Sequence, residues 1–278
     1  MRLHLCGVRG STPAPGPLFS RVGGHTSCVA VAHDGAWRPQ LLLDGGTGLR
    51  RVAELLGDAP FEGALVLGHL HWDHTQGIPF FSAGDRPDAS VDVHLPVADG
   101  AAAHALDGLM EPPFFPIDAR GLDGAWSFNA LDEGVLEVEG FTVLVREIPH
   151  AGGRTFGFRV TDGDTSIAYV SDHGPIALGP GPDGWGPYHE AVCELADSVD
   201  VLLHDAQYTA LELESLPHFG HSAIDYAVAL AERCRVGRLL LYHHDPERTD
   251  DEVDALVESH QSSSVQVAAA VEGDVIDV

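Results

Sequence analysis

The stretch Gly68-His69-Leu70-His71-Trp72-Asp73-His74-Thr75-Gln76-Gly77 decides the fold of this chain. The apolar run Ala64 to Leu67 comes directly before it and predicts a buried strand, and Thr75 to Phe81 can open a helix. Three imidazoles and a carboxylate therefore emerge at the end of a buried strand, and these are the ligands that zinc and similar ions prefer. A solvated polar loop is the alternative, but this density of ligands beside a strand is typical of a functional site.

The spacing within this motif predicts two metal positions. In an extended segment, His69 and His71 point to the same side because side chains alternate with a period of two. These two imidazoles can therefore grip one ion together. Asp73 and His74 lie beyond the bend, so they are better placed for a second ion.

Length and charge set limits on the class of protein. The 278 residues suit one large domain, and we expect a single domain over 1–278 because no low-complexity linker divides the chain. The 42 acidic residues outnumber the 15 basic ones, all of them Arg, so the formal net charge is −27. A surface that binds polyanions needs clustered cations. We therefore predict a small phosphorylated substrate and no large nucleic-acid footprint.

The distribution of apolar residues and cysteines predicts a cytoplasmic protein that has no contact with a membrane. No window reaches the roughly 18 apolar residues of a membrane span, and the apolar run Leu3 to Val8 is too short for a signal peptide. The four cysteines show no C-x-x-C pairing, which favours buried thiols in a reducing compartment. The apolar, proline-rich segment Pro112 to Pro116 predicts a lid or pocket wall and permits a homodimer.

Predicted strands and helices alternate along the chain, with strand-only runs in the middle, which indicates two packed α/β halves. Several predicted strands end in further polar side chains, and these are Asp44, His150, Asp172, His204-Asp205 and His243-His244. Predicted helices cover 49–56, 99–110, 190–196 and 223–233, and a last helix ends near 259. Ser222 is the predicted N-cap of the fourth helix, and a capping box at Thr249 opens the last one.

Asp44, the motif His69-x-His71-x-Asp73-His74, His150, Asp172 and His243 follow one another in this order along nearly the whole chain. This set resembles the metallo-β-lactamase superfamily. The resemblance implies an α/β fold, the αββα four-layer sandwich, with two mixed sheets packed face to face and helices outside. It also implies a dinuclear site in the cleft between the sheets that binds two divalent ions. Zinc is favoured by affinity, and manganese or iron are the alternatives.

The resemblance divides the implied ligands between the two ions. One ion would be bound by His69, His71 and His150, and the other by Asp73, His74 and His243. Asp172 would bridge the two ions. Asp44 would orient the histidine loop from behind. His243 and His244 share one loop, and strand alternation lets only one of them face the site easily; the resemblance selects His243.

Two further patterns narrow the resemblance. The pair His204-Asp205 with Gly220-His221-Ser222 is similar to signatures of tRNA 3′-processing endonucleases and their small-substrate relatives. The opening Gly-Val-Arg-Gly-Ser-Thr-Pro resembles the group that includes phosphoribosyl 1,2-cyclic phosphate phosphodiesterase. The resemblance implies that His221, oriented by Asp205, acts near the scissile phosphate. Together with Asp73, these two residues are the catalytic candidates.

We therefore predict a phosphodiesterase that cleaves a small cyclic phosphodiester through a metal-bridging hydroxide. Hydrolysis of a lactone, carboxylic ester or thioester is the alternative, although the Asp205–His221 pair would then lack an obvious purpose. A tRNA 3′-processing endonuclease is disfavoured by the net charge. From a different class, the site could be vestigial in a binding protein, but unused buried ligands would cost stability.

Overall fold

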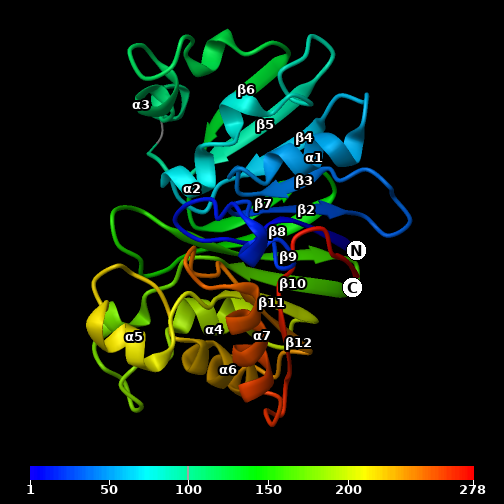
Figure 1. Ribbon diagram of the computed structural model, residues 1–278. Coiled ribbons are helices and arrows are strands. Elements are labelled where there is room, and N and C mark those ends of the chain that lie inside the picture. Colours follow the sequence, from blue (N-terminus) through cyan, green and yellow to red (C-terminus); the bar gives the residue numbers. More distant parts are fainter. Residues whose placement is uncertain (99) are drawn as a thin grey trace.

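Two seven-stranded sheets pack face to face, and helices cover both outer faces (Figure 1). The computed structural model describes residues 1–98 and 100–278. The four-layer arrangement confirms the predicted αββα sandwich. That the chain forms one domain over 1–278 stays a prediction.

The first sheet has the strand order β14-β1-β2-β3-β4-β5-β6. The strands from β14 to β3 pair antiparallel, and those from β3 to β6 are parallel. Their bounds are β1 (Arg2–Gly7), β2 (Cys28–Ala32), β3 (Leu41–Leu43), β4 (Glu62–Val66), β5 (Ser90–Leu95), β6 (Ala125–Ala130) and β14 (Val275–Asp277).

The second sheet has the order β13-β12-β11-β10-β9-β8-β7. Here β7 to β10 pair antiparallel, and β10 to β13 are parallel. The bounds are β7 (Gly134–Val138), β8 (Phe141–Glu147), β9 (Phe156–Asp162), β10 (Thr165–Val170), β11 (Val201–Asp205), β12 (Arg238–Tyr242) and β13 (Gln266–Ala269).

Alternation along the strands divides the apolar side chains between three cores. Residues such as Leu43, Val66, Phe158 and Tyr169 fill the space between the two sheets. The other face of each sheet packs against helices. The helices are α1 (Leu49–Leu56), α2 (Trp72–Thr75), α3 (Asp107–Met110), α4 (Glu190–Ala196), α5 (Ala210–Ser215), α6 (Ile224–Arg233) and α7 (Asp250–Ser259).

The parallel strands position the site. Parallel strands bring their carboxyl ends to one edge of a sheet, where α/β folds bind ligands. The chain segments that leave β3, β4, β10, β11 and β12 carry the polar side chains singled out from the sequence. These residues are Asp44, the loop from Gly68 to His74, Asp172, Asp205 and His243.

The structure corrects several predicted elements. The predicted helix over 99–110 begins at a residue outside the described part of the chain, and the remainder holds only a 3₁₀ turn (Ala102–His104) and the short α3. Gly108 lies in this segment, and glycine is a poor helix former. The predicted helix over 75–81 is likewise divided into α2 and a 3₁₀ turn (Ile78–Phe80). Strands β6 and β14 and helix α5 were not predicted.

The two predicted helix caps have opposite outcomes. Thr249 and Glu252 form the predicted capping box at the start of α7. Ser222 does not cap α6, whose N-cap is Ala223. Instead, the Ser222 hydroxyl donates a 2.5 Å hydrogen bond to the carbonyl oxygen of His173. A serine before a helical pattern predicts a cap only while no nearby carbonyl competes for its hydroxyl.

Candidate metal centre

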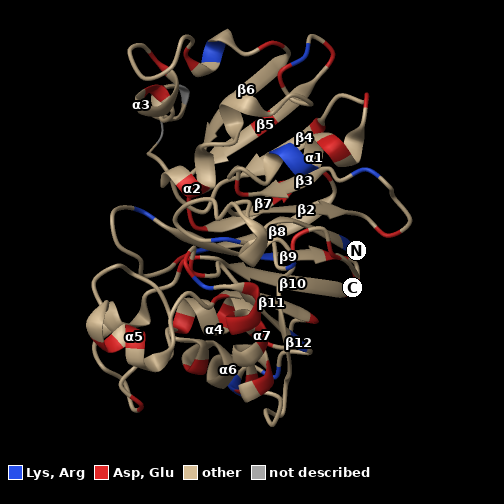
Figure 2. Ribbon diagram, in the orientation of Figure 1, with Lys and Arg blue, Asp and Glu red and all other residues tan. Residues whose placement is uncertain are grey.

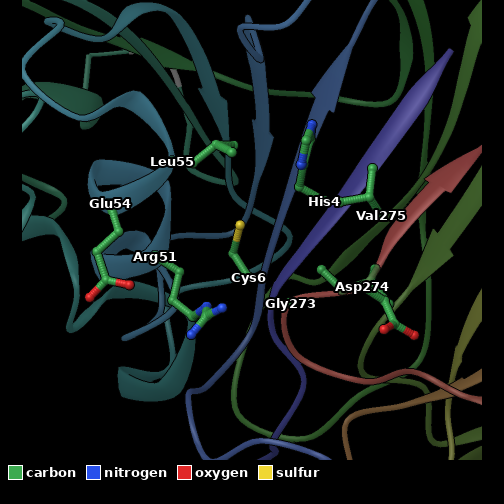
Figure 3. Close-up of a pocket in the computed structure, with 9 residues that line it drawn as sticks. His4, Cys6, Arg51, Glu54, Leu55, Gly273, Asp274 and Val275 are labelled. Carbon is green, nitrogen blue, oxygen red and sulfur yellow. The ribbon is translucent and has the colours of Figure 1, made fainter.

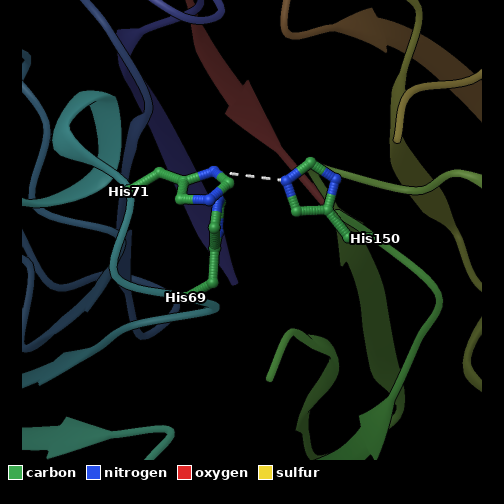
Figure 4. A group of neighbouring side chains, drawn as sticks. All are labelled: His69, His71 and His150. Atoms are coloured by element: carbon green, nitrogen blue, oxygen red, sulfur yellow. Dashed lines mark hydrogen bonds between the residues drawn. The ribbon is translucent and has the colours of Figure 1, made fainter. Parts of the chain in front are cut away.

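Three imidazoles from two different loops form the first group of candidate ligands (Figure 4). His69 and His71 follow β4, and His150 follows β8, so the group joins the two sheets. One nitrogen from each ring lies within 4.8 Å of the others. The Nδ1 of His71 is 3.3 Å from the Nε2 of His150.

A second group consists of Asp73, His74, Asp172 and His243, all of them buried. The Nε2 of His74 lies 3.0 Å from Oδ2 of Asp172. The Nε2 of His243 lies 3.1 Å from Oδ2 of Asp73. The four candidate ligand atoms again lie within 4.8 Å of one another, so they surround a space that suits one cation.

Asp172 lies between the two groups. Its Oδ1 is 3.7 Å from the Nε2 atoms of both His69 and His150. Its Oδ2 faces His74 and, at 3.4 Å, His243. One carboxylate therefore offers an oxygen to each of two neighbouring positions.

Asp44 orients the histidine loop, as the sequence predicted. Its Oδ2 accepts a 2.7 Å hydrogen bond from Nδ1 of His74 and another from the hydroxyl of Tyr169. Its Oδ1 accepts a bond from the backbone N–H of Gly68. Because Nδ1 of His74 carries the hydrogen, Nε2 presents its lone pair to the site, which is the usual arrangement around a metal-binding histidine.

His243 requires special backbone geometry. Its φ is +56°, and that of Asp44 is +62°, so both lie in the left-handed region that residues with a side chain rarely adopt. Strain of this kind occurs mostly at functional sites. Gly10 makes room for the His243 ring, since a Cβ at Gly10 would lie 2.4 Å from Nδ1 of His243.

The residues present fit a pair of divalent ions. Several buried polar atoms at the site have no hydrogen-bond partner, although such atoms are normally satisfied. They are Nδ1 and Nε2 of His69, Nε2 of His74, Oδ2 of Asp172 and Nδ1 of His243. Neutral imidazole and carboxylate ligands are also the donor set that zinc binds.

The pKa shifts point the same way. Burial lowers the pKa of His69 well below its ordinary value, and nearby His74 lowers it further. His69 is therefore neutral, as a metal ligand must be. Burial opposes protonation of His74 too, but the carboxylates of Asp172, Asp73 and Asp44 raise the pKa of His74 well above the ordinary value. The carboxylates thus attract a positive charge, which a metal ion would supply in place of the proton.

His221 and Asp205 form a hydrogen-bonded pair beside the candidate ligands. Nδ1 of His221 donates a 2.9 Å bond to Oδ2 of Asp205 and lies 3.8 Å from Oδ1 of Asp172. Asp205 is fully buried, and its carboxylate also accepts 3.0 Å bonds from the backbone N–H groups of His173 and Gln207. These bonds hold the carboxylate in one orientation, and it in turn fixes the tautomer of His221.

A cavity of about 400 Å³ opens onto these groups. Its walls include the candidate site residues His71, Asp73, His150, Asp172 and His221. Sequence reasoning missed three other wall residues, Ser11, Leu70 and Phe219. For Trp72, the sequence favours a buried structural tryptophan over a pocket wall. Trp72 is in fact 76% exposed and lines the cavity. Its exposure could have been inferred from its position in a loop between two candidate ligands, His71 and Asp73.

Arg9, Arg154 and Arg159, for which the sequence leaves phosphate binding and a structural ion pair both open, lie outside the described walls of this cavity. The segment Pro112 to Pro116 is absent from the described walls of this cavity. Arg9 is buried and donates to the carbonyl oxygens of Gly23 and Arg248. Arg154 pairs with Glu147, so both side chains are occupied by structural contacts.

The other histidines have separate positions. His244 is buried, and its Nε2 donates a 3.0 Å hydrogen bond to the carbonyl oxygen of Ala270, outside the ligand groups. His173 is buried behind Asp205, with Nδ1 3.1 Å from Nε2 of His204. His218 is exposed.

A second cavity, of about 270 Å³, lies between α1 and the β1–β14 edge (Figure 3). Its walls include His4, Cys6, Arg51 and Asp274. Among the described residues, no group of three metal-ligating side chains converges there. The cavity beside Asp172 is therefore the candidate functional site.

A family model described as "Beta-lactamase superfamily domain" matches residues 40–244, most of the chain. The chain belongs to this superfamily. Ribonuclease Z of Anoxybacillus flavithermus is 26% identical over 74% of this chain and 76% of its own length. Ribonuclease Z of Salinibacter ruber is 28% identical over 79% of each.

Solved structures share the fold. The metallo-β-lactamase fold protein YhfI of Bacillus subtilis superposes with a TM-score of 0.72 at 18% identity and covers 99% of both chains. Human tRNase Z, short form, has a TM-score of 0.64 at 20% identity over 100% of this chain and 99% of its own. The comparisons confirm the predicted branch of the superfamily and a metal-dependent hydrolase. The identity of the metal stays a prediction.

The predicted partner was wrong. We expected a small phosphorylated substrate and no large nucleic-acid footprint, but the curated relatives are ribonucleases. The physical reason is that a net charge of −27 is a sum over the whole surface. Figure 2 shows acidic residues on the outer helices α4, α5 and α7, so the total charge does not describe the substrate cleft.

No helix in the described part of the chain is both long and apolar enough to pass through a membrane. The cytoplasmic location and the possible homodimer stay predictions.

Proposed function

We propose that this chain hydrolyses phosphodiester bonds and that RNA carries the bond it cleaves. The observation that carries the proposal is the His221–Asp205 pair, at 2.9 Å, beside a carboxylate that reaches two groups of metal ligands. A metal site alone would serve many hydrolases. A buried, oriented imidazole next to it suits a reaction with a charged transition state and an alkoxide leaving group. The ribonuclease names of the relatives support RNA as the substrate class.

The proposed ligands are divided between two positions. His69, His71 and His150 would hold one divalent ion, Asp73, His74 and His243 would hold the other, and Asp172 would contact both. When bound, such a pair makes a hydroxide nucleophile available near neutral pH and neutralises the non-bridging oxygens of a phosphate. Asp73 has a second contact that fixes it, because its Oδ2 accepts a 2.7 Å bond from the backbone N–H of Ser11.

His221 would serve the leaving group. Its Nδ1–H is committed to Asp205, so Nε2 is the atom that can carry a proton to the departing oxygen. Asp205 itself stays in place because two backbone N–H groups bind it. Removing a group of this kind typically slows turnover about 10²–10⁴-fold.

The test compares His221→Ala with His104→Ala, a control histidine that is exposed and outside the cavity walls. Both proteins are loaded with zinc or manganese, their metal content is measured, and cleavage of a structured RNA is followed. We expect the His221 variant to keep two ions and to lose about 10²–10⁴-fold in kcat, and the His104 variant to match the unaltered protein. Unchanged turnover, or loss of an ion from the His221 variant, would refute the role assigned to His221.

A substrate panel tests the reaction class. The unaltered, metal-loaded protein is assayed with the RNA, bis-p-nitrophenyl phosphate, a lactone and a thioester. Cleavage of both phosphodiesters supports the proposal. Hydrolysis of the lactone or thioester alone would overturn it in favour of carbonyl chemistry.

A further inference from the structure

Two large aromatic side chains line the candidate cavity although they are poorly shielded from water. Trp72 is 76% exposed and Phe219 is 52% exposed. Exposed apolar groups next to a polar cavity are typical of ligand-binding surfaces. Leu70 adds a third apolar side chain to the same walls.

The two aromatics are fixed to the site through their neighbours in the chain. Trp72 begins α2 and lies between His71 and the buried Asp73. Phe219 precedes Gly220, whose carbonyl oxygen accepts a 2.6 Å bond from Nδ1 of His150. Both backbones are therefore anchored to the candidate metal ligands, and both rings border the space in which a scissile phosphate would lie.

The remaining walls limit what these rings can bind. The described residues that line this cavity include no arginine, and the chain has no lysine. Arginine and lysine side chains therefore make no direct contact with a ligand in these walls. Stacking on aromatic rings is the other major source of affinity for a nucleic acid strand, and it works because every base has a π-face.

We infer that Trp72 and Phe219 form a nucleobase-stacking site that holds the bases next to the scissile phosphodiester. The inference rests on the proposed function and extends it, because it assigns recognition to the base as well as to the phosphate. His218 extends the surface, since its ring centroid lies 4.4 Å from that of Phe219. The site suits a single strand, because a base in a duplex is not free to stack on a side chain.

The kinetic test uses two esters with the same leaving group. Uridine 5′-(p-nitrophenyl phosphate) carries a base, and ethyl p-nitrophenyl phosphate does not. We compare the ratio of kcat/KM for the two esters in the metal-loaded protein and in the variants Trp72→Ala, Phe219→Ala and Trp72→Phe. The matched control is Trp37→Ala, because Trp37 is 59% exposed and lies outside the cavity walls.

We expect the ratio to fall roughly 5- to 150-fold in Trp72→Ala, the change that corresponds to ~1–3 kcal/mol per stacked base. Trp72→Phe should recover most of it, and Trp37→Ala should leave it unchanged. If the ratio is unaltered in both alanine variants but the esters are hydrolysed, the stacking site is overturned and the proposed function stands. Hydrolysis of neither ester would count against the proposed function itself.

A binding measurement stands apart from turnover. Uridine 5′-monophosphate and ethyl phosphate are titrated into the metal-loaded protein by calorimetry. The stacking site predicts tighter binding of the nucleotide, and the difference should be lost in the Trp72→Ala, Phe219→Ala double variant. Equal affinity of the two ligands for the unaltered protein would overturn the inference whatever the esters show.

Discussion

Two of the candidate metal ligands, His74 and His150, are oriented by hydrogen bonds on their far sides. His74 donates to Asp44 and His150 donates to the carbonyl oxygen of Gly220. His221 donates in the same way to Asp205. Each bond fixes one tautomer and turns the other nitrogen toward the cavity. The precision of the site therefore depends on oxygens that never touch substrate.

Asp44→Asn is expected to weaken metal binding about 10–100-fold, because outer-shell partners of metal-binding histidines contribute about that much. The amide would no longer offer a charged acceptor to His74. Competition with a chromophoric zinc chelator measures the effect. Tyr169→Phe is the control, since it removes one bond to the same carboxylate but leaves Asp44 in place. Equal zinc affinity in Asp44→Asn and the unaltered protein would contradict this role.

Gly10→Ala is expected to displace His243 and to reduce the bound metal from two ions to one. The added Cβ would meet Nδ1 of His243 at 2.4 Å and Oε1 of Gln207 at 2.7 Å. Metal analysis of the purified variant checks the expectation. Gly108→Ala is the control, because a Cβ there meets nothing within 4 Å. Full loading of the Gly10 variant would show that His243 is not held by this contact.

At the scale of the elements, the site combines loops that sequence patterns locate well. Each predicted ligand except His150 follows a strand with a short, continuous apolar run, and helices α1 and α4 match their predicted bounds. Strand β6 was missed because the apolar pattern of its sequence Ala-Trp-Ser-Phe-Asn-Ala is interrupted by two polar residues and the strand follows an irregular segment. Strand β14 is only three residues long and is stabilised by pairing with β1, a contact between chain ends that no local pattern reveals.

His33 joins the two sheets just after β2. Its Nδ1 contacts Oδ2 of Asp162 at 3.0 Å, its Nε2 contacts the carbonyl oxygen of Glu139, and its ring stacks on Phe141. Burial opposes protonation of this ring, but the Glu139 carbonyl and the Asp162 carboxylate raise the pKa of His33 above its ordinary value. The stabilisation is therefore fully present below the ordinary imidazole pKa and is lost as pH rises through the raised pKa of the folded state.

We expect His33→Gln to destabilise the protein at about pH 5.5 and to have a smaller effect at about pH 8.5. Urea unfolding at the two pH values measures the difference between the variant and the unaltered protein. His104→Gln provides the control, because His104 contacts Asp107 in a local pair that joins no two sheets. A stability difference that grows with rising pH would show that protonated His33 does not stabilise the folded state.

At the scale of the whole molecule, the family resemblance implied the sandwich, which the structure confirms, but the partner predicted from the net charge was wrong. The spacing of the candidate ligands is a local property of the sequence. It predicts a site because the carboxyl ends of parallel strands, which carry these ligands, meet at one edge of a sheet. The net charge is a global sum over the whole chain, and it includes acidic residues on outer helices such as α4, α5 and α7 (Figure 2). The exposure of Trp72 depends on how the loop packs, so composition could not reveal it.

Removing the metal is expected to lower the melting temperature. Ions that bind only the folded state stabilise it by about 2.7 kcal/mol at a hundredfold excess over Kd. The candidate ligands come from both sheets, so the ions would join the halves of the sandwich. Thermal unfolding before and after dialysis against a chelator, with zinc then restored, measures the effect. A melting temperature that is the same with and without zinc would show that the ligand groups bind no ion tightly.

The two oxygens of Asp172 face different groups of histidines. A cation at one position would therefore polarise the same carboxylate that the other position needs, and the two cations would also repel each other. Half-loaded protein is consequently a distinct species, with its own second affinity constant, rather than an average of empty and full molecules. Preparations with fractional metal content would then be mixtures of empty, half-loaded and fully loaded protein, and the rate measured on them would not scale in proportion to zinc.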